Sequence, residues 1–522
     1  MKKLLALLLT LVLLATALVG CGNNDNPPDN EPDQPPSSSN GDSTTGGNET
    51  TDGEGTTDGN GTTDNGNNST VEGKATITLI GATFDGGETS KTFNVGDKVF
   101  VNAPDKDGET FIAWKDNNDN YLERLNDYVF TAQNDITLIA EYVTNTSEGE
   151  LLFDTDDGQN YYVAGVGTWK GNTLVIPDTY NGKPVTRIGI NAFKNNSDIV
   201  NLTLPDSITE IASGAFSTCS YLKNVTLSKN IVEVYYDAFK DCSFITTLNY
   251  NILSTNLTFP VNIEGIRKLV VGEGVTSVEY GYDSLKTVIL SSSVASVDLS
   301  GTSIEAIQLH EGVKKLHLKD CEYLEELTIP ESIEYLSLSG CKSLKRLVVP
   351  NSVKTDYERF SFSGCSNLET IEIKAEMTSI PSSFFYQCTS LKNVTLPNTP
   401  IRSVGESAFA GCSSLETIKL PNTVSSIGAR AFENCSSLKS FVVPYEVSVL
   451  DNYHVFFGCS SLKEITLPVT LVRIFDDAIA GCNVETVNYS GTQTEWQNTS
   501  LSYHFKNANI NFKVTTDYNI DN

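Results

Sequence analysis

The stretch that decides the fold is AFAGCSSLETIKL, residues 408–420. Its last six residues follow the form L-x-x-L-x-L, in which apolar and polar side chains alternate at the end as they do in a β-strand. A Phe lies six residues before the first Leu, a Cys lies three residues before it, and Pro421 follows the stretch. We therefore predict a strand here, preceded by a short helical turn around the Ala-Phe pair that places Phe409 and Cys412 inside.

This pattern recurs along most of the chain. Its first position falls at 199, 222, 245, 266, 285, 304, 324, 344, 368, 391, 415, 438, 462 and 484, which makes fourteen registers. One coil cannot bury its apolar side alone, so stacked coils form a continuous core and a parallel sheet. The predicted fold class for residues 150–486 is a repeat solenoid with a parallel β-sheet and short helical turns.

Coil length divides the solenoid. Most coils have 22 to 24 residues, but the coils near 266–344 have 19 or 20 and lack the Ala-Phe pair. Leu318 and Leu338 stand where the longer coils have Phe. We expect a strand in place of the helical turn on the far wall of these short coils, with a long-coil arm on either side.

The repeat resembles a known family. Segments 222–227, 391–396 and 415–420, with Phe and Cys upstream and Pro downstream, are very close to the BspA-like leucine-rich repeat of bacterial surface proteins. The resemblance covers roughly residues 170 to 515. It implies a leucine-rich repeat fold and a role in binding protein or glycan ligands at the cell surface.

Ten of the eleven cysteines lie in the repeats, all at close to the same phase. An even number of cysteines in an exported chain is typical of disulfides. The phase, however, is that of a buried ladder position, and Asn196 takes this position in the first coil. Parallel side chains in a ladder point inward, so free buried thiols are favoured over disulfides. Zinc or catalytic roles are not favoured, because no Cys-x-x-Cys pair and no nearby set of His residues exists.

Residues 1–20 are typical of a lipoprotein signal peptide. Lys2 and Lys3 precede an apolar run that ends in LVGC, residues 18–21. This ending resembles the bacterial lipobox, which implies lipidation of Cys21 and attachment to a membrane. The alternative is an ordinary signal peptide followed by a chance cysteine.

Residues 21–73 predict a disordered acidic tether, because they carry eleven Asp and Glu residues and no Lys or Arg. No later segment approaches the length of an apolar membrane span, so we expect the rest of the chain outside the cytoplasm.

Residues 74–143 predict a small β domain, with alternating segments at 76–79, 98–101 and 135–140. FIAW, residues 111–114, and LIAEY, residues 138–142, resemble the Listeria–Bacteroides repeat of the internalin B-repeat type. This resemblance implies a β-grasp-like module that serves as a spacer or weak binding unit. Between these segments, four residues match some EF-hand offsets, namely Asp116, Asn118, Asn120 and Asp127. Tyr121 stands where that loop needs Gly, so a solvated turn is favoured over a calcium site.

A ligand of the solenoid would bind to its outward columns. The position after the first Leu carries nearly alternating charges, at Lys345, Glu369, Lys392, Glu416, Lys439, Lys463 and Glu485. Such charges favour locking of the register over a ligand site. The central outward column is mixed and rich in Thr, without an aromatic stripe for sugars. The aromatic candidates, for which packing is the alternative role, are Tyr235, Tyr236, Tyr280 and Tyr282. The sequence assigns no ligand-binding residue.

The sequence shows no catalytic motif. None of the four histidines sits in a nucleophile or metal motif: His310, His317, His454 and His504. We predict no enzyme activity, no cofactor and no metal. A formal charge of −29 and a pI near 4.5 argue against nucleic acid as a partner.

Residues 487–522 predict a cap. Their segment YSGTQTEW, residues 489–496, resembles the closing motif of the repeat family and implies that Trp496 plugs the end of the core.

These inferences predict a lipid-anchored protein on the extracellular face of the bacterial cell membrane, which binds an extracellular protein or glycan through its solenoid. A non-catalytic, scaffolding lipoprotein of the envelope is the alternative.

Overall fold

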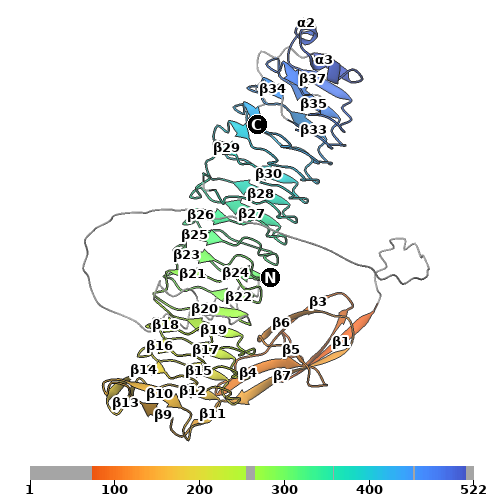
Figure 1. Ribbon diagram of the computed structural model, residues 1–522. Coiled ribbons are helices and arrows are strands. Elements are labelled where there is room, and N and C mark those ends of the chain that lie inside the picture. The colour runs from red at the N-terminus through yellow and green to blue at the C-terminus, as the bar shows by residue number, and fades with distance from the viewer. Residues whose placement is uncertain (1–72, 254–264, 357, 451–452, 476, 513–522) are drawn as a thin grey trace, which may run out of the picture. The chain divides into compact units, whose positions relative to one another are not determined.

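The computed structural model describes the chain from the first module strand to the end of the last coil. The described residues are 73–253, 265–356, 358–450, 453–475 and 477–512. All of them belong to one compact unit, Thr70–Asn522, in which coils stack one upon another (Figure 1). The predicted signal peptide, Cys21 and the tether lie outside the described residues, so the expectations for them stay predictions.

The N-terminal strands form a small β module, which we call the module. Its strands are β1 (Lys74–Ile80), β2 (Ser90–Asn94), β3 (Lys98–Asn102), β4 (Glu109–Lys115), β5 (Tyr121–Glu123), β6 (Asp127–Thr131) and β7 (Ile136–Thr144). One sheet has the order β2-β1-β7-β4-β5, with β1 and β7 parallel, while β3 and β6 form a separate antiparallel pair. Alternation at 76–79, 98–101 and 135–140 predicted β1, β3 and β7, and these strands are confirmed.

The L-x-x-L-x-L segments form the front of the solenoid. Successive front strands pair in parallel, in equal register, as where Leu202 pairs with Val225. The front strands are β12 (Thr173–Val175), β15 (Asn201–Thr203), β17 (Asn224–Thr226), β19 (Thr247–Tyr250), β20 (Lys268–Val271), β22 (Thr287–Ile289), β24 (Ala306–Ile307), β27 (Arg346–Val349), β28 (Thr370–Ile373), β30 (Asn393–Thr395), β33 (Ser440–Val442), β35 (Glu464–Leu467), β37 (Thr486–Tyr489) and β38 (Asn509–Phe512). The parallel solenoid that the repeat predicted is thus confirmed.

The front differs from the prediction at two coils. Segments 324–329 and 415–420 form no strand, so the front is divided into three sheets, β12 to β24, β27 to β30 and β33 to β38. Leu327 and Ile418 are 9% and 8% exposed, whereas Ile465 at the matching position of β35 is fully buried. Exposure alone does not explain the break, because Val394 of β30 is only partly buried and still pairs with β28. The expectation of a strand in all fourteen registers was wrong for these two segments. Conversely, β12 and β38 extend the front beyond the first and last register.

A second set of parallel strands forms the side wall. At the N-terminal end these are β9 (Leu152–Asp154), β10 (Tyr161–Gly165), β13 (Thr179–Tyr180), β14 (Lys183–Ile188), β16 (Glu210–Ile211) and β18 (Glu233–Val234), beside the pair β8 (Ser147–Glu148) and β11 (Lys170–Gly171). The short coils contribute β21 (Ser277–Glu279), β23 (Ser296–Asp298), β25 (Lys315–His317) and β26 (Tyr335–Ser337). Later coils contribute β29 (Ser379–Ile380), β31 (Ser403–Val404), β32 (Ser426–Ile427), β34 (Val449–Leu450) and β36 (Arg473–Ile474). Strand on the far wall of the short coils is confirmed.

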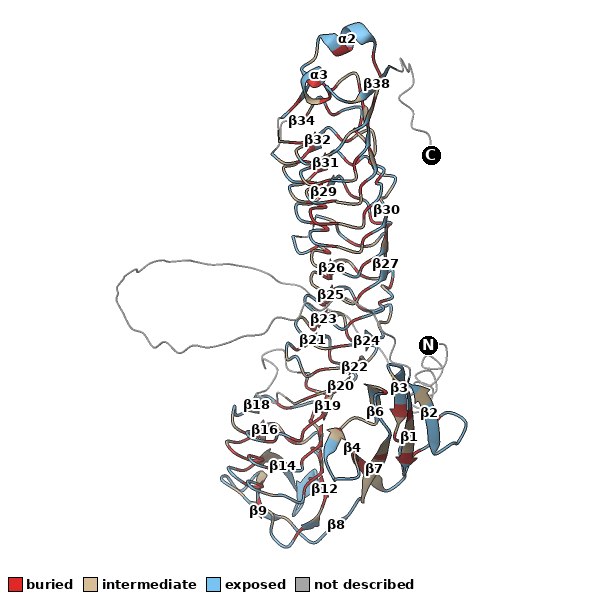
Figure 2. Ribbon diagram, turned by 90° about the vertical axis from the view of Figure 1, so that its right-hand side faces the viewer, coloured by how far each residue is buried: buried red, intermediate tan, exposed pale blue. Residues whose placement is uncertain are grey.

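The Ala-Phe segments of the long coils form turns that carry the Phe column into the core. The N–H of Phe409 donates to Ala431 O of the following coil (2.8 Å), a contact between coils where a helix would bond within itself. Neighbouring rings stack in parallel, as for Phe193 and Phe216, whose centroids lie 5.2 Å apart. Leu318 and Leu338 fill the same position in the short coils and are fully buried, as predicted. Buried segments accordingly recur from coil to coil (Figure 2).

The ten repeat cysteines are free thiols, which confirms the expectation from their phase. Each thiol donates to the backbone carbonyl of the Phe or Leu one coil earlier, for example Cys412 Sγ to Phe385 O at 3.2 Å. Asn196, at the same position in the first coil, accepts the backbone N–H groups of Asp198 and Ile199. The position therefore serves polar backbone groups inside the core, where an unpaired group costs about 1–3 kcal/mol.

Two helices follow the last repeat register, α2 (Gln493–Gln497) and α3 (Leu501–His504). Thr492 and Glu495 form a capping box at the start of α2, in which each side chain bonds the other residue's backbone N–H. Trp496 is buried against Tyr489, at a ring distance of 5.0 Å. Its indole belongs to the continuous solenoid core and covers the last coil.

Candidate functional site on the front face

One column of side chains on the front face contacts the module in the first coils and forms ion pairs in the later coils. This column is the position after the first Leu of each coil, and we call it the charge column. In the first coils the module lies against it, with β4 beside the front strands (Figure 1). In the later coils its side chains pair with each other. The division shows which part of the front face is covered and which part faces solvent.

Lys223 fixes the module to the solenoid. Its side chain is 3% exposed, and Nζ donates to the carbonyl oxygens of Phe111, Ile112 and Arg124, each at 2.7 Å. Nζ also lies 4.6 Å from the centre of the Phe111 ring. Burial lowers the pKa of Lys223 to about 7, while the nearby Glu123 carboxylate acts in the opposite direction and Arg124 lowers the pKa further.

Glu123 supplies the matching charge from the module. The residue is 7% exposed and its carboxylate pairs with Arg267, while Lys286 Nζ lies 3.6 Å away. Beside it, Arg124 donates to Ser243 O at 3.0 Å and stacks over the Phe244 ring at 4.0 Å. Lys223, Arg267 and Lys286 all belong to the charge column, so the module's contact follows this column across several coils.

Beyond the module the charge column forms ion pairs between neighbouring coils. The pairs are Lys345–Glu325 (3.1 Å), Lys392–Glu369 (3.2 Å), Lys439–Glu416 and Lys463–Glu485 (2.8 Å). Their side chains are more than half exposed or nearly so, and such pairs contribute at most about 1 kcal/mol each. The charges therefore pair between neighbouring coils, and the register-locking role predicted for them stays a prediction.

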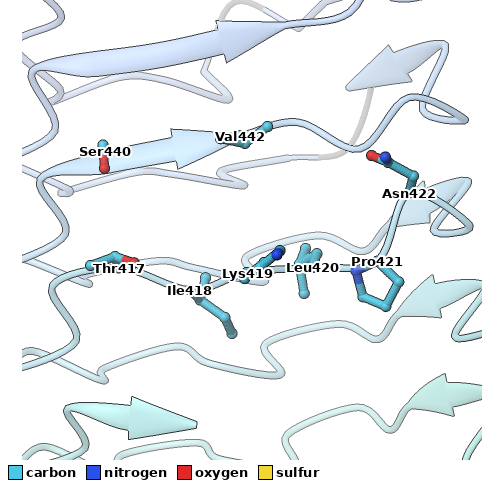
Figure 3. A pocket seen from close by; sticks show the side chains of 8 residues that line it. All are labelled: Thr417, Ile418, Lys419, Leu420, Pro421, Asn422, Ser440 and Val442. Carbon is cyan, nitrogen blue, oxygen red and sulfur yellow. The ribbon is translucent and has the colours of Figure 1, made fainter. Parts of the chain in front are cut away.

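A hollow of about 220 Å³ opens on the solvent-facing part of the front. It lies where segment 415–420 leaves the sheet, between that segment and β33 (Figure 3). The lining residues are Thr417, Ile418, Lys419, Leu420, Pro421, Asn422, Ser440 and Val442. The hollow thus coincides with one of the two interruptions of the front ladder.

The lining of the hollow suits binding. Thr417 and Ser440 present hydroxyl groups, and Val442 with Pro421 offers apolar contact. Lys419 is exposed and has no ion-pair partner among the described residues, unlike the neighbouring lysines of the charge column. One free cation beside hydroxyl and apolar groups can hold an acidic or polyhydroxylated group. The sequence pattern of this coil matches that of its neighbours, so it gave no signal of the hollow.

Other residues singled out from the sequence have structural roles. Asp116 accepts the N–H groups of Asn118 and Asn120 at 2.8 and 3.0 Å and so closes its own turn, as expected of a solvated turn. Asp127 instead bonds Asn102. Tyr280 is buried in the core, whereas Tyr235 and Tyr236 are exposed on the side wall. Across the part of the chain that the structure describes, no group of three or more metal-ligating side chains occurs.

One polar row on the side wall escaped the sequence analysis. Asp298, His317 and Ser337 are register partners on β23, β25 and β26, and His317 Nδ1 lies 3.3 Å from Asp298 Oδ2. Ser337 is only 5% exposed, which leaves no room for a substrate at its hydroxyl. The row is therefore a hydrogen-bonded feature of the wall.

No helix within the described ranges is long and apolar enough to cross a membrane. Cys21, the predicted lipidation site, lies outside these ranges.

Comparison with known proteins gives a family and a fold. The family model described as "BspA type Leucine rich repeat region (6 copies)" matches residues 174–317, 255–354, 311–402 and 378–511, which together span more than half of the chain. A search of curated proteins finds no match. The chain is similar to a leucine-rich repeat protein from Bacteroides ovatus, with 26% identity and a TM-score of 0.50 over 70% of this chain and 98% of the other. It also resembles a leucine-rich cell surface protein from Faecalibacterium prausnitzii, with 21% identity and a TM-score of 0.28 over 69% and 98%.

Proposed function

Because the chain belongs to the BspA-type leucine-rich repeat family, we propose that it is a bacterial surface protein that binds an extracellular protein or glycan through its front face. One observation carries the proposal: the front face of the first coils already binds a folded partner, the module, through the same charge column. A face that recognises one folded structure in the first coils is left open to solvent in the later coils. The hollow beside Lys419 lies on this solvent-exposed part of the front face.

The proposal predicts which side chains a ligand contacts. Lys419→Glu reverses the free cation of the hollow, and Val442→Asp removes its apolar side. We expect either change to weaken binding of the full chain to its ligand in a screen of extracellular matrix proteins and glycans by about tenfold, the usual cost of one central contact. Lys240→Glu makes the same charge change on an exposed turn outside the front face and serves as the matched control. Equal loss for Lys240→Glu and Lys419→Glu would place the ligand elsewhere.

A scaffolding role in the envelope is the second candidate. The ion pairs of the charge column favour it, because paired charges stabilise the stack and leave few groups for a ligand. Stable co-purification of the full chain with envelope proteins, together with no saturable ligand in the screen, would support this role over adhesion.

We also infer that Cys21 carries the lipid anchor and that the module is of the internalin B-repeat type. The lipobox-like ending LVGC supports the anchor, and the strands at 74–144 are consistent with such a module. Cys21→Ala should move the protein from the detergent phase of a membrane extraction into the medium. Continued partition of Cys21→Ala into detergent would contradict the anchor.

A further inference from the structure

We propose that the front face of coils 222–290 is itself a binding site for an extended acidic peptide, and that the module closes this site within the same chain. Glu123 then stands where the ligand's carboxylate would bind. The site is separate from the hollow beside Lys419 and does not depend on a ligand there.

The covered face forms a basic strip in an acidic chain. The charge column carries Lys223, Thr246, Arg267 and Lys286 in successive coils, and Lys268 lies in the next outward column. Neighbouring front strands lie about 4.8 Å apart, so Arg267 and Lys286 are adjacent along the stack, while Lys223 lies two coils before Arg267. The whole chain carries a formal charge of −29, which makes a run of cations without intervening acidic residues in the column unusual for this molecule.

The module groups that contact the strip are main-chain carbonyls and one side-chain carboxylate. Lys223 contacts three main-chain carbonyl oxygens, and two of them belong to Phe111 and Ile112 of strand β4. Arg267 and Lys286 contact the carboxylate of Glu123, the last residue of strand β5. The strip therefore recognises extended backbone carbonyls together with an acidic side chain. This chemistry favours an acidic peptide over a polysaccharide, which has no main-chain carbonyls.

The contact between the module and the solenoid has the properties of an interface that can dissociate within the chain. The module and the solenoid have separate hydrophobic cores. Their shared apolar cluster is small, with Ile112, Ala113 and the half-buried Val143 on one side and Val200 and Phe244 on the other. In addition, the hydroxyl of Thr246, which lies between Lys223 and Arg267 in the charge column, is buried without a hydrogen-bond partner among the described residues. Polar contacts between separately folded parts resemble transient protein interfaces.

The test uses the full chain and a synthetic acidic peptide, poly-L-glutamate. Glu123→Lys places a cation against Arg267 and Lys286 and should open the module. Asp119→Lys makes the same charge change in an exposed turn of the module and is the matched control. We expect Glu123→Lys to bind poly-L-glutamate about tenfold more tightly than Asp119→Lys at low salt, with loss of this gain at high salt. Hydrogen exchange of β4 should accelerate in Glu123→Lys alone, which shows that the module has opened.

Further variants decide whether the strip is the site. Adding Arg267→Gln and Lys286→Gln to Glu123→Lys should abolish the gain while leaving β4 open. The proposal is overturned if Glu123→Lys opens β4 without any gain in binding, or if the gain survives removal of Arg267 and Lys286. Dextran sulfate, a polyanion without peptide carbonyls, should bind more weakly than poly-L-glutamate to Glu123→Lys. Equal or tighter binding of dextran sulfate would overturn the peptide class. Lys419→Glu should leave binding of poly-L-glutamate unchanged. A negative result for the basic strip can therefore be told apart from a negative result for the hollow.

Discussion

Replacing Lys223 with Met is the sharpest test of how the module is held. Met keeps the aliphatic stem but removes the ammonium, so the carbonyl oxygens of Phe111, Ile112 and Arg124 lose their donor. These oxygens belong to the module and lie between it and the solenoid. Water does not replace their lost hydrogen bonds unless the contact opens. We therefore expect Lys223→Met to weaken docking of the module and to leave the solenoid folded, because the two cores are separate.

The magnitude follows from the three contacts of 2.7 Å. Hydrogen bonds to a charged group contribute about 1.5–3 kcal/mol each, and burial of the ammonium, which Met avoids, offsets several kcal/mol of that sum. Leaving a buried acceptor without its hydrogen-bond partner costs about 1–3 kcal/mol, so three carbonyl oxygens give a cost of about 3 kcal/mol or more. Taking the lower value, about 3 kcal/mol, the open form of the module becomes about 100-fold more populated.

Hydrogen exchange measured by mass spectrometry tests this value directly. Amides of β4 (Glu109–Lys115) should lose about 100-fold in protection, while amides of β28 and β35 in the later coils should keep theirs. Lys240→Met, at an exposed turn outside the front face, should leave both regions unchanged. If β4 in Lys223→Met stays within about threefold of the unaltered chain, the ammonium does not hold the module and the reasoning fails.

Two further predictions address the core. Phe409→Ala empties a fully buried place between two rings and should lower the free energy of unfolding in urea by about 3–5 kcal/mol, whereas Phe457→Ala, at a partly exposed ring, should cost about 1 kcal/mol or less; equal costs would contradict the stacked column. The ten repeat thiols should react with a thiol reagent only after unfolding, and a chain mass lowered by two hydrogens per cysteine pair under non-reducing conditions would instead indicate disulfides.

The repeat pattern predicted the parts of the fold that depend on neighbouring coils. Alternation in L-x-x-L-x-L predicted most of the front strands, and the spacing of Phe409 and Cys412 from Leu415 predicted a buried ring and a buried thiol. These features follow from the sequence because each coil packs against a near copy of itself, so a local pattern determines its surroundings. The shorter spacing between 266 and 344 predicted strand on the far wall for the same reason.

The module's docking site could not be predicted in this way. Lys223 occupies the same column as Lys392 and Lys439, which are exposed, and nothing in its own coil distinguishes it. Its burial depends on Phe111 and Arg124, about a hundred residues earlier in the chain. The hollow was missed for a related reason, since segment 415–420 has the same pattern as coils whose segments do pair. Its departure from the sheet is not recorded in the hydrophobic spacing, which is the same in this coil as in its neighbours.

The bonding of the cysteines has a consequence for how such a chain can change its length. Each thiol donates to a carbonyl of the coil before it and needs no second cysteine as a covalent partner. Gene duplication or loss of a single coil therefore leaves no cysteine without its mate and requires no rearranged cross-links. Disulfide-bonded modules must gain or lose cysteines in pairs, whereas this stack can grow or shrink by one coil at a time. Newly made chains also need no oxidant to complete their cores.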